Sequence, residues 1–366
     1  MATILLFLAI FVVLILGYPV ALSLAGTALI AAAIGIATGS FEPAFLTAMP
    51  SRLFGIITNQ TLIAVPLFIL MGVTLEKTRI AQHLLDSMSR VFGGLPGGLG
   101  LSVTIVGMLM AASTGIVGAT VVTMGLMSLP AMLNARYNVP LATGTICATG
   151  TLGQIIPPSI ALVLLGDVLS NAYQQAQLSV GIFNPKTVSV GHLFAGAIIP
   201  GLVLVFLYTI YIVSTATLNP EKAPPVKTGN ITFTLMMGSI FPPLFLIIAV
   251  LGSILAGIAT PTEAAGVGAM GALTLAAIRR ELSLRHLQEI ALSTTKTTAM
   301  VFFILIGASM FSLVFRGYGG DELVHGWLSG LPGGVIGATV VVMLVIFLLG
   351  FILDFIEITF VVVPIV

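Results

Sequence analysis

The feature that most limits how this chain can fold is an apolar stretch at residues 95–130, LPGGLGLSVTIVGMLMAASTGIVGATVVTMGLMSLP. It has roughly 33 uncharged residues between its two prolines, whereas one membrane crossing needs about 20. Small polar residues, Ala112-Ser113-Thr114-Gly115, interrupt its centre. The pattern predicts a helical hairpin that enters the membrane and turns back at Ser113 to Gly115. Non-helical backbone at that depth is tolerated only inside protein or beside a water-filled cavity, so the turn is a candidate binding site.

The composition places the whole chain in a membrane. Of its 366 residues, 58% are hydrophobic and 7% are charged, and the mean hydropathy is +1.19, whereas a globular domain has about 25% charged residues. The net charge of +1 gives no basis for binding nucleic acid. The single cysteine, Cys147, excludes an internal disulfide framework and a cysteine-rich metal site. We predict an all-α polytopic membrane protein.

The first part of the chain predicts two short spans and an interfacial helix. Gly17-Tyr18-Pro19 separates the two spans within residues 3–37, because glycine and proline interrupt helices. Residues 42–60 are amphipathic and are expected to lie along the membrane surface. A further span is predicted at residues 61–75.

A second interrupted segment, residues 140–170, contains GTLGQIIPPSI at residues 150–160. Each proline removes a backbone hydrogen bond and clashes with the preceding turn, so these residues cannot form one regular helix. We predict a broken transmembrane helix, unwound in mid-membrane. After it, the sequence predicts a polar loop at 171–191, a span at 193–214 and a linker at 218–229.

The second half of the chain repeats motifs of the first at a nearly constant offset. Three motifs recur: FILMG at Phe68 as FILIG at Phe303, LPGG at Leu95 again at Leu331, and Pro130 as Pro364. The offsets are 235, 236 and 234 residues. The amphipathic segment is echoed at residues 279–289. The repeat predicts a second hairpin that starts at 331 and runs to 366.

Charge placement predicts that the repeats are inverted. With the N-terminus outside, ten of the 13 basic residues fall in cytoplasmic connections, and only Arg52, Lys186 and Arg316 lie elsewhere. The first hairpin then enters from the cytoplasm and the second from outside, which is typical of secondary transporters with a site near the midplane. The repeat also places a partner of the broken helix beyond Val366, so we expect the native protein to continue.

Few ionisable residues lie in the predicted spans. Asp354 and Glu357 fall where the repeat places the second hairpin tip; carboxylates at such depth are by default functional, and the alternative is that they cap a helix. Arg316 either lies at the interface with its charge in water or pairs with a substrate carboxylate. Glu263, after Pro261, is interpreted as marking a helix start.

Hydroxyls and unwound carbonyls could bind a sodium ion, which prefers hard oxygen ligands. The candidate ligands are Ser113, Thr114, Gly115, Gly150, Thr151, Pro157 and Ser159. Close helix packing by small residues is the alternative, but it does not account for the paired prolines beside Gln154. The four histidines fall in predicted connections and are interpreted as surface residues without metal-site spacing.

Five motifs together resemble one known family. They are AASTGIVGATVVTMGLMSLPAM, ATGTICATGTLGQIIPPSIALVLLGD, GHLFAGAIIPG, GIATPTEAAGVGAMGAL and LDFIEITFVVVPI. In order and spacing they are similar to the large membrane subunit of tripartite ATP-independent periplasmic (TRAP) transporters, over essentially the whole chain. The resemblance implies an elevator-type transporter of the bacterial inner membrane that imports an organic acid anion, such as a dicarboxylate, with Na+. It also implies two partners, a small membrane subunit and a periplasmic substrate-binding protein.

The resemblance implies substrate-binding roles as well. The family's hairpin-tip serine matches Ser113, the aspartate of the second tip matches Asp354, and the arginine before the second hairpin matches Arg316. Sodium ligands would lie around Ser113 and residues 150–159, with a second set in the other repeat. Sodium is expected to pre-organise the two tips, so that the anion binds only when the cations are present.

The resemblance also divides the chain into scaffold and moving parts. Scaffold helices and amphipathic arms are expected at residues 1–60 and 192–296, and the two halves of a transport domain at 61–191 and 297–366. One alternative is a single-component carboxylate or ion transporter of similar hairpin architecture.

Two other classes of protein were weighed against a transporter. A membrane-embedded aspartyl protease would use Asp167 and Asp354, but LLGD at Asp167 lacks the preceding glycine that the GxGD motif of such enzymes requires. A passive channel is disfavoured because a tip that binds ions firmly releases them slowly. We therefore predict a transporter rather than an enzyme.

Overall fold

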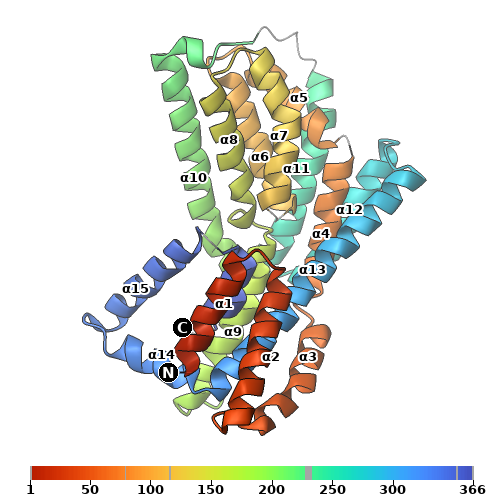
Figure 1. The fold of residues 1–366 in the computed structure, drawn as a ribbon. Helices are drawn as coiled ribbons and strands as arrows, with labels where there is room; N and C mark the ends of the chain where they lie inside the picture. Colours follow the sequence, from red (N-terminus) through yellow and green to blue (C-terminus); the bar gives the residue numbers. More distant parts are fainter. Residues whose placement is uncertain (1, 79, 115–116, 227–232, 352, 365–366) are drawn as a thin grey trace. The chain divides into compact units, whose positions relative to one another are not determined.

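The computed structural model describes residues 2–78, 80–114, 117–226, 233–351 and 353–364, and all regular structure in them is helical (Figure 1). This confirms the all-α prediction. Among these residues, four helices are long and apolar enough to cross a membrane by length and composition: Val20–Thr38 (α2), Val190–Leu218 (α10), Gly238–Leu255 within α11, and Leu284–Gly317 (α13). These helices support the predicted multi-pass membrane protein.

The chain folds into two compact units. Unit 1 comprises Met1–Asn59, Asp167–Thr187 and Thr298–Val366, and unit 2 comprises Gln60–Gly166 and Val188–Thr297. Compactness alone does not identify a scaffold or a moving part. The assignment of scaffold and transport parts therefore stays a prediction.

Unit 1 contains both ends of the chain. Its elements are α1 (Ala2–Ile15), α2, the 3-10 helix η1 (Pro43–Ala48), α3 (Met49–Thr58), the end of α9 (Ile160–Ser179), the end of α13, α14 (Gly320–Ser329), α15 (Gly334–Leu349), α16 (Phe355–Glu357) and a π-helical turn, Ile358–Val362. The break between α1 and α2 falls at Gly17 to Pro19, as predicted. A Cβ on Gly307 of α13 would lie 2.5 Å from the backbone oxygen of Ala21, so glycine permits α2 and α13 to pack closely.

Unit 2 holds the remaining helices. They are α4 (Ala64–Lys77), α5 (Ile80–Phe92), α6 (Gly98–Thr114), α7 (Val117–Asn134), α8 (Val139–Thr151), η2 (Leu152–Gln154), the start of α9, α10, η3 (Pro220–Lys222), α11 (Phe233–Leu255), α12 (Pro261–Ile278) and the start of α13. The α4–α12 pair forms an extensive contact in this unit. Its α12 face is built from small buried residues, and a Cβ on Gly268 would lie 2.7 Å from Met71 Sδ. The small residues of the GIATPTEAAGVGAMGAL motif therefore serve helix packing.

The start of α12 confirms the interpretation of Glu263. The Thr260 backbone N–H donates to Glu263 Oε2 at 2.8 Å, and the Glu263 N–H donates to Thr260 Oγ1 at 3.3 Å. This reciprocal capping box satisfies two donors at the helix end. Glu263 is thus a helix-start residue.

Two predicted boundaries were wrong. The polar loop predicted at 171–191 begins later, because α9 continues to Ser179; this segment is rich in alanine and glutamine, which form helices readily. The second amphipathic arm is not separate either. Its residues from Leu284 onward are the first turns of α13, which runs without a break to Gly317, since neither proline nor glycine occurs among residues 284–306.

The segment after α9 is held by one buried side chain. Gln177, with 8% of its surface exposed, donates from Nε2 to the Lys186 backbone oxygen at 2.9 Å and accepts from the Lys186 N–H at 3.0 Å. Both bonds fold residues 181–186 back onto α9. The side-chain amide of Gln177 thus satisfies both backbone groups of Lys186, as a neighbouring backbone would.

We expect Gln177→Ala to loosen this turn without unfolding unit 1. Two hydrogen bonds worth about 1 kcal/mol each are lost, so limited proteolysis within residues 181–187 should become severalfold faster. Gln175→Ala, at an exposed position of the same helix, is the control and should be cut at the wild-type rate. Equal cleavage of both variants would contradict this role of Gln177.

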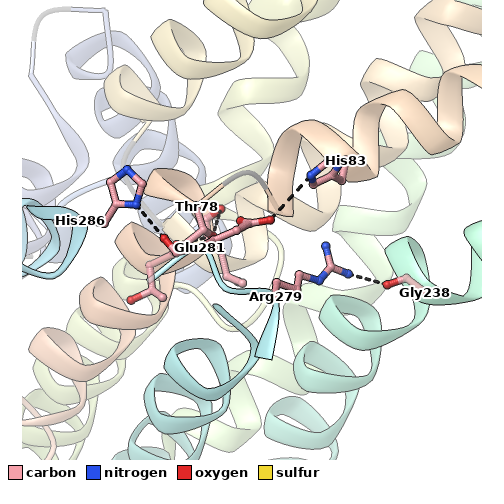
Figure 2. Close-up of polar contacts among 8 residues, drawn as sticks. Thr78, His83, Gly238, Arg279, Glu281 and His286 are labelled. Atoms are coloured by element: carbon pink, nitrogen blue, oxygen red, sulfur yellow. Dashed lines mark hydrogen bonds and ion pairs between the residues drawn. The ribbon is translucent and has the colours of Figure 1, made fainter. Parts of the chain in front are cut away.

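Polar contacts join the α12–α13 turn to neighbouring helices of unit 2 (Figure 2). Glu281 Oε1 lies 3.7 Å from His83 Nε2 of α5, and the Glu281 backbone oxygen lies 2.7 Å from His286 Nδ1. Arg279 Nη2 donates to the backbone oxygen of Gly238 in α11 at 2.5 Å. Charged residues assigned to the cytoplasmic side are therefore used here to fix the turn between two long helices.

Candidate functional site

The first predicted hairpin and the broken helix pack together in unit 2. The described part of α6 ends at Thr114 and that of α7 begins at Val117, so the turn predicted between them lies outside the described residues. α6 contacts α7, α8 and η2, and the three long helices lie side by side in Figure 1. Gly115 and the side chains of Ser113 and Thr114 lie outside the described part of the structure. The re-entrant course of this hairpin in the membrane stays a prediction.

Glycines allow the helices of this group to approach closely. A Cβ on Gly150 would clash with Val121 Cγ2 and would lie 3.1 Å from the Val121 Cα. A Cβ on Gly107 of α6 would lie 2.7 Å from Thr149 Cβ. Gly150, which we predicted as a sodium ligand, thus has a packing role that explains its identity. Its role as a ligand stays a prediction.

The break between α8 and α9 confirms the predicted broken helix. Regular helix ends at Thr151, η2 follows, and α9 begins at Ile160, so the paired prolines stand in the non-helical connection. The fully buried Ser159 donates from Oγ to the Gln154 backbone oxygen at 2.7 Å and accepts from the Leu162 N–H at 3.4 Å. The exposed Thr151 donates to the Ala148 oxygen at 2.8 Å. Both hydroxyls therefore have partners within the chain.

One carboxylate beside the hairpin was not singled out by the sequence. Glu76, near the end of α4, accepts a hydrogen bond from Thr123 Oγ1 of α7 at 2.9 Å. It links the second hairpin helix to α4 within unit 2. It follows directly after the span predicted at residues 61–75, so hydrophobic periodicity gave no signal for this contact.

The second predicted tip lies in unit 1. α15 ends at Leu349 and α16 begins after Asp354, which confirms a helix break where the repeat places the tip. Asp354 Oδ1 accepts from the Phe355 N–H at 2.8 Å, and Glu357 Oε2 accepts from the Asp354 N–H at 3.1 Å, which completes a capping box. The capping alternative is therefore confirmed for both carboxylates. Glu357 is buried and Asp354 is exposed, so only the latter has its carboxylate open to a ligand.

Arg316 ends α13 and pairs with a carboxylate that we did not predict. Its Nε lies 3.1 Å from Oδ2 of Asp321, in the first turn of α14. Arg52 of α3 lies close enough to interact electrostatically with both Arg316 and Asp321. The pairing of Arg316 with Asp321 could have been found from their short separation in the chain. The approach of Arg52 could not.

Asp167, one of the two aspartates that a membrane-embedded protease would use, has amide partners in unit 1. Asn59 Nδ2 donates to Asp167 Oδ1 at 2.8 Å, and Asn171 Nδ2 donates to Oδ2 at 3.5 Å. These bonds fix the end of the α3 segment to α9. A carboxylate held by two amides in this way serves as a structural link.

The structure thus brings the predicted residues together in two groups. Gly150, Thr151, Pro157 and Ser159 share unit 2 with α6 and α7, while Arg316 and Asp354 belong to unit 1. The approach of Ser113 to Asp354 stays a prediction. Among the described residues, no three His, Cys, Asp or Glu side chains gather as metal ligands. A cation here would need hydroxyl and carbonyl oxygens, which the described connection between α8 and α9 contains.

Comparisons with known proteins point to one family. The family model for the tripartite ATP-independent periplasmic transporter, DctM component, matches residues 7–366. The C4-dicarboxylate TRAP transporter large permease protein of Pseudomonas aeruginosa is 29% identical over 295 residues, covering 80% of this chain and 64% of the relative. The corresponding Rhodobacter capsulatus protein is 32% identical over 287 residues, covering 76% and 62%. The chain therefore spans less than two thirds of the length of these relatives.

A solved structure shares the fold. The YdaH transporter of Alcanivorax borkumensis, described as having an unusual topology, superposes with a TM-score of 0.59 at 14% identity, covering 87% of this chain and 71% of that one. At this identity the likeness concerns the fold alone. It agrees with the all-helical fold.

Proposed function

Because the chain belongs to the DctM component family of tripartite ATP-independent periplasmic transporters, we propose that it imports an organic acid anion with sodium as the large permease subunit. The observation that carries the proposal is the family match over residues 7–366. The family makes this chain part of a transporter and not of an enzyme. Two relatives named for C4-dicarboxylates support a carboxylate as the substrate. The proposed location is the bacterial inner membrane.

The interrupted helices of the chain support a transport mechanism. Interrupted helices expose carbonyl groups and helix ends, which can bind a cation and an anion without a dedicated metal cluster. We assign sodium ions to two segments of unit 2, Ser113 to Gly115 and Gly150 to Ser159, and a second set of ligands to the other repeat, which contains Asp354. We assign the anion to Ser113, Arg316 and Asp354. In this mechanism, sodium binding pre-organises the two hairpin tips, so the anion binds only to the sodium-loaded protein. The loaded domain then shifts across the membrane in an elevator motion.

The proposal includes two partners. The family name implies a tripartite assembly, so a small membrane subunit and a periplasmic binding protein are expected to work with this chain. The binding protein would deliver the anion to the outer face of the permease. Its pocket would then set the choice among organic acids.

Reconstituted transport tests the proposal. The full-length permease, its small subunit and its binding protein are placed in proteoliposomes, and uptake of a panel of labelled carboxylates, including succinate, is measured. We expect uptake of at least one of them with an inward sodium gradient and a loss of uptake with potassium instead. Equal uptake in potassium would overturn sodium coupling. Uptake by the permease without its partners would favour the single-component alternative.

A further inference from the structure

Unit 1 contains two arginines and one aspartate at a single corner, which we call the arginine corner: Arg52, Arg316 and Asp321. Arg52 and Arg316 are two of the three basic residues that charge placement leaves outside the cytoplasmic connections. Two neighbouring arginines here are therefore unusual, because most basic residues of this chain are assigned to the cytoplasmic side. The corner carries one more positive than negative charge.

Aromatic packing brings the two arginines together. Phe41 and Phe45 precede α3 and have ring centroids 5.9 Å apart, and Phe41 lies 5.0 Å from the Tyr318 ring. A Cβ on Gly317 would lie 2.9 Å from Phe41 Cζ, so the chain directly after Arg316 packs on this aromatic pair. The segment that leads into Arg52 is thus fixed to the segment that contains Arg316.

Tyr318 holds the corner to the rest of unit 1. Its hydroxyl donates to the Ala31 oxygen of α2 at 2.7 Å, and its backbone oxygen accepts from Thr3 Oγ1 of α1 at 2.9 Å. A Cβ on Gly35 would clash with the Tyr318 hydroxyl, so α2 has a glycine where the ring fits. α1 and α2 therefore position the end of α13.

The charges at this corner are incompletely paired. Arg316 meets Asp321 through Nε, and a guanidinium has five N–H donors, so donors remain for a second carboxylate. Arg52 is half-buried and makes no hydrogen bond or ion pair among the residues that the structure describes. Burial and the nearby Arg316 charge lower the pKa of Arg52, while Asp321 raises it. A partly desolvated guanidinium without a direct partner is stabilised when an anion binds.

The geometry points to an anion site at the arginine corner, in which Asp321 occupies the place of a substrate carboxylate until the organic acid pairs with Arg52 and Arg316. The inference rests on the proposed function and adds Arg52 and Asp321 to it. The Arg316 and Asp321 side chains are 33% and 51% exposed, so water and an incoming anion can reach the pair. Exposed ion pairs are weak, and a substrate carboxylate can therefore replace Asp321.

Two substitutions with opposite expected effects test the site. In the reconstituted complex, using the carboxylate of the panel with the highest uptake, Arg52→Gln should raise the KM about 10- to 100-fold, because a charge-assisted contact is lost. Asp321→Asn should lower the KM severalfold, because the internal competitor for Arg316 loses its charge. Misfolding cannot produce the second effect, so the pair of variants separates binding from damage to the fold.

Matched controls are available in the same chain. Glu322→Gln changes the neighbouring exposed carboxylate in the first turn of α14, and Arg285→Gln changes an exposed arginine of unit 2; both should keep the wild-type KM. Sodium-driven uptake by wild type with an unchanged KM in Arg52→Gln and Asp321→Asn would overturn the arginine corner and leave the proposed function standing. Failure of the wild-type complex to take up any carboxylate would overturn both the proposed function and the arginine corner.

Discussion

Replacing Asp354 with asparagine is expected to leave the permease folded and to reduce sodium-driven uptake by about 100-fold. Asparagine is as good an N-cap as aspartate, so the hydrogen bond to the Phe355 N–H can persist. What the substitution removes is the negative charge. In the proposed mechanism this exposed charge belongs to the site that holds the substrate and its accompanying cation, and charged hydrogen bonds are worth about 1.5–3 kcal/mol.

Two further variants show whether capping or charge accounts for the effect. Glu357→Gln keeps an acceptor for the Asp354 N–H, because glutamine also completes a capping box, and it should retain most uptake. Asp354→Ala loses both cap and charge and should lower the melting temperature as well. Wild-type uptake by Asp354→Asn would show that Asp354 only caps α16.

Gly150→Ala is expected to destabilise unit 2 by about 1–3 kcal/mol, the usual cost of overpacking a tight interface. The added methyl group would clash with Val121 Cγ2 and would approach the Val121 backbone to 3.1 Å. The contact joins α7 to α8, so uptake should also fall. Thermal unfolding of the detergent-solubilised complex measures the first effect, and proteoliposome uptake measures the second.

The same helix supplies a control for this substitution. Gly144 is exposed and has nothing within 4 Å of an added Cβ, so Gly144→Ala should be neutral or stabilising by up to about 1 kcal/mol. Val121→Ala removes Cγ2, and combining it with Gly150→Ala should restore part of the lost stability. If Gly144→Ala and Gly150→Ala behave alike, close packing does not explain Gly150.

The breaks in the helices could be predicted from the sequence because their signals are local. Paired prolines predicted the gap before α9, whereas the turn predicted from small polar residues after α6 lies outside the described residues. The repeat placed Asp354 and Glu357 at the second hairpin tip, and the structure bears out the capping alternative given for both. Proline and glycine interrupt a helix within a few residues of where they occur, so the sequence alone locates the interruption.

Helix continuity and long-range pairing were predicted less well. A polar composition after residue 170 indicated a loop, but alanine and glutamine extended α9 to Ser179. Arg52 was interpreted only as part of an amphipathic surface helix, because nothing in its neighbourhood reveals that Phe41 packs beside Gly317. Contacts of this kind depend on the tertiary fold, which hydrophobic periodicity does not specify.

The unbroken length of α13 also sets how thick a bilayer this protein fits. Its uncharged stretch, residues 297–315, lies between Lys296 and Arg316 and is about 29 Å long at about 1.5 Å per residue. This matches a hydrocarbon core of about 30 Å. A thicker bilayer would draw Arg316 towards the lipid tails, and a thinner one would tilt the helix. The acyl-chain length of the surrounding lipids therefore influences how deep Arg316 lies relative to the membrane surface, and so how well water reaches it.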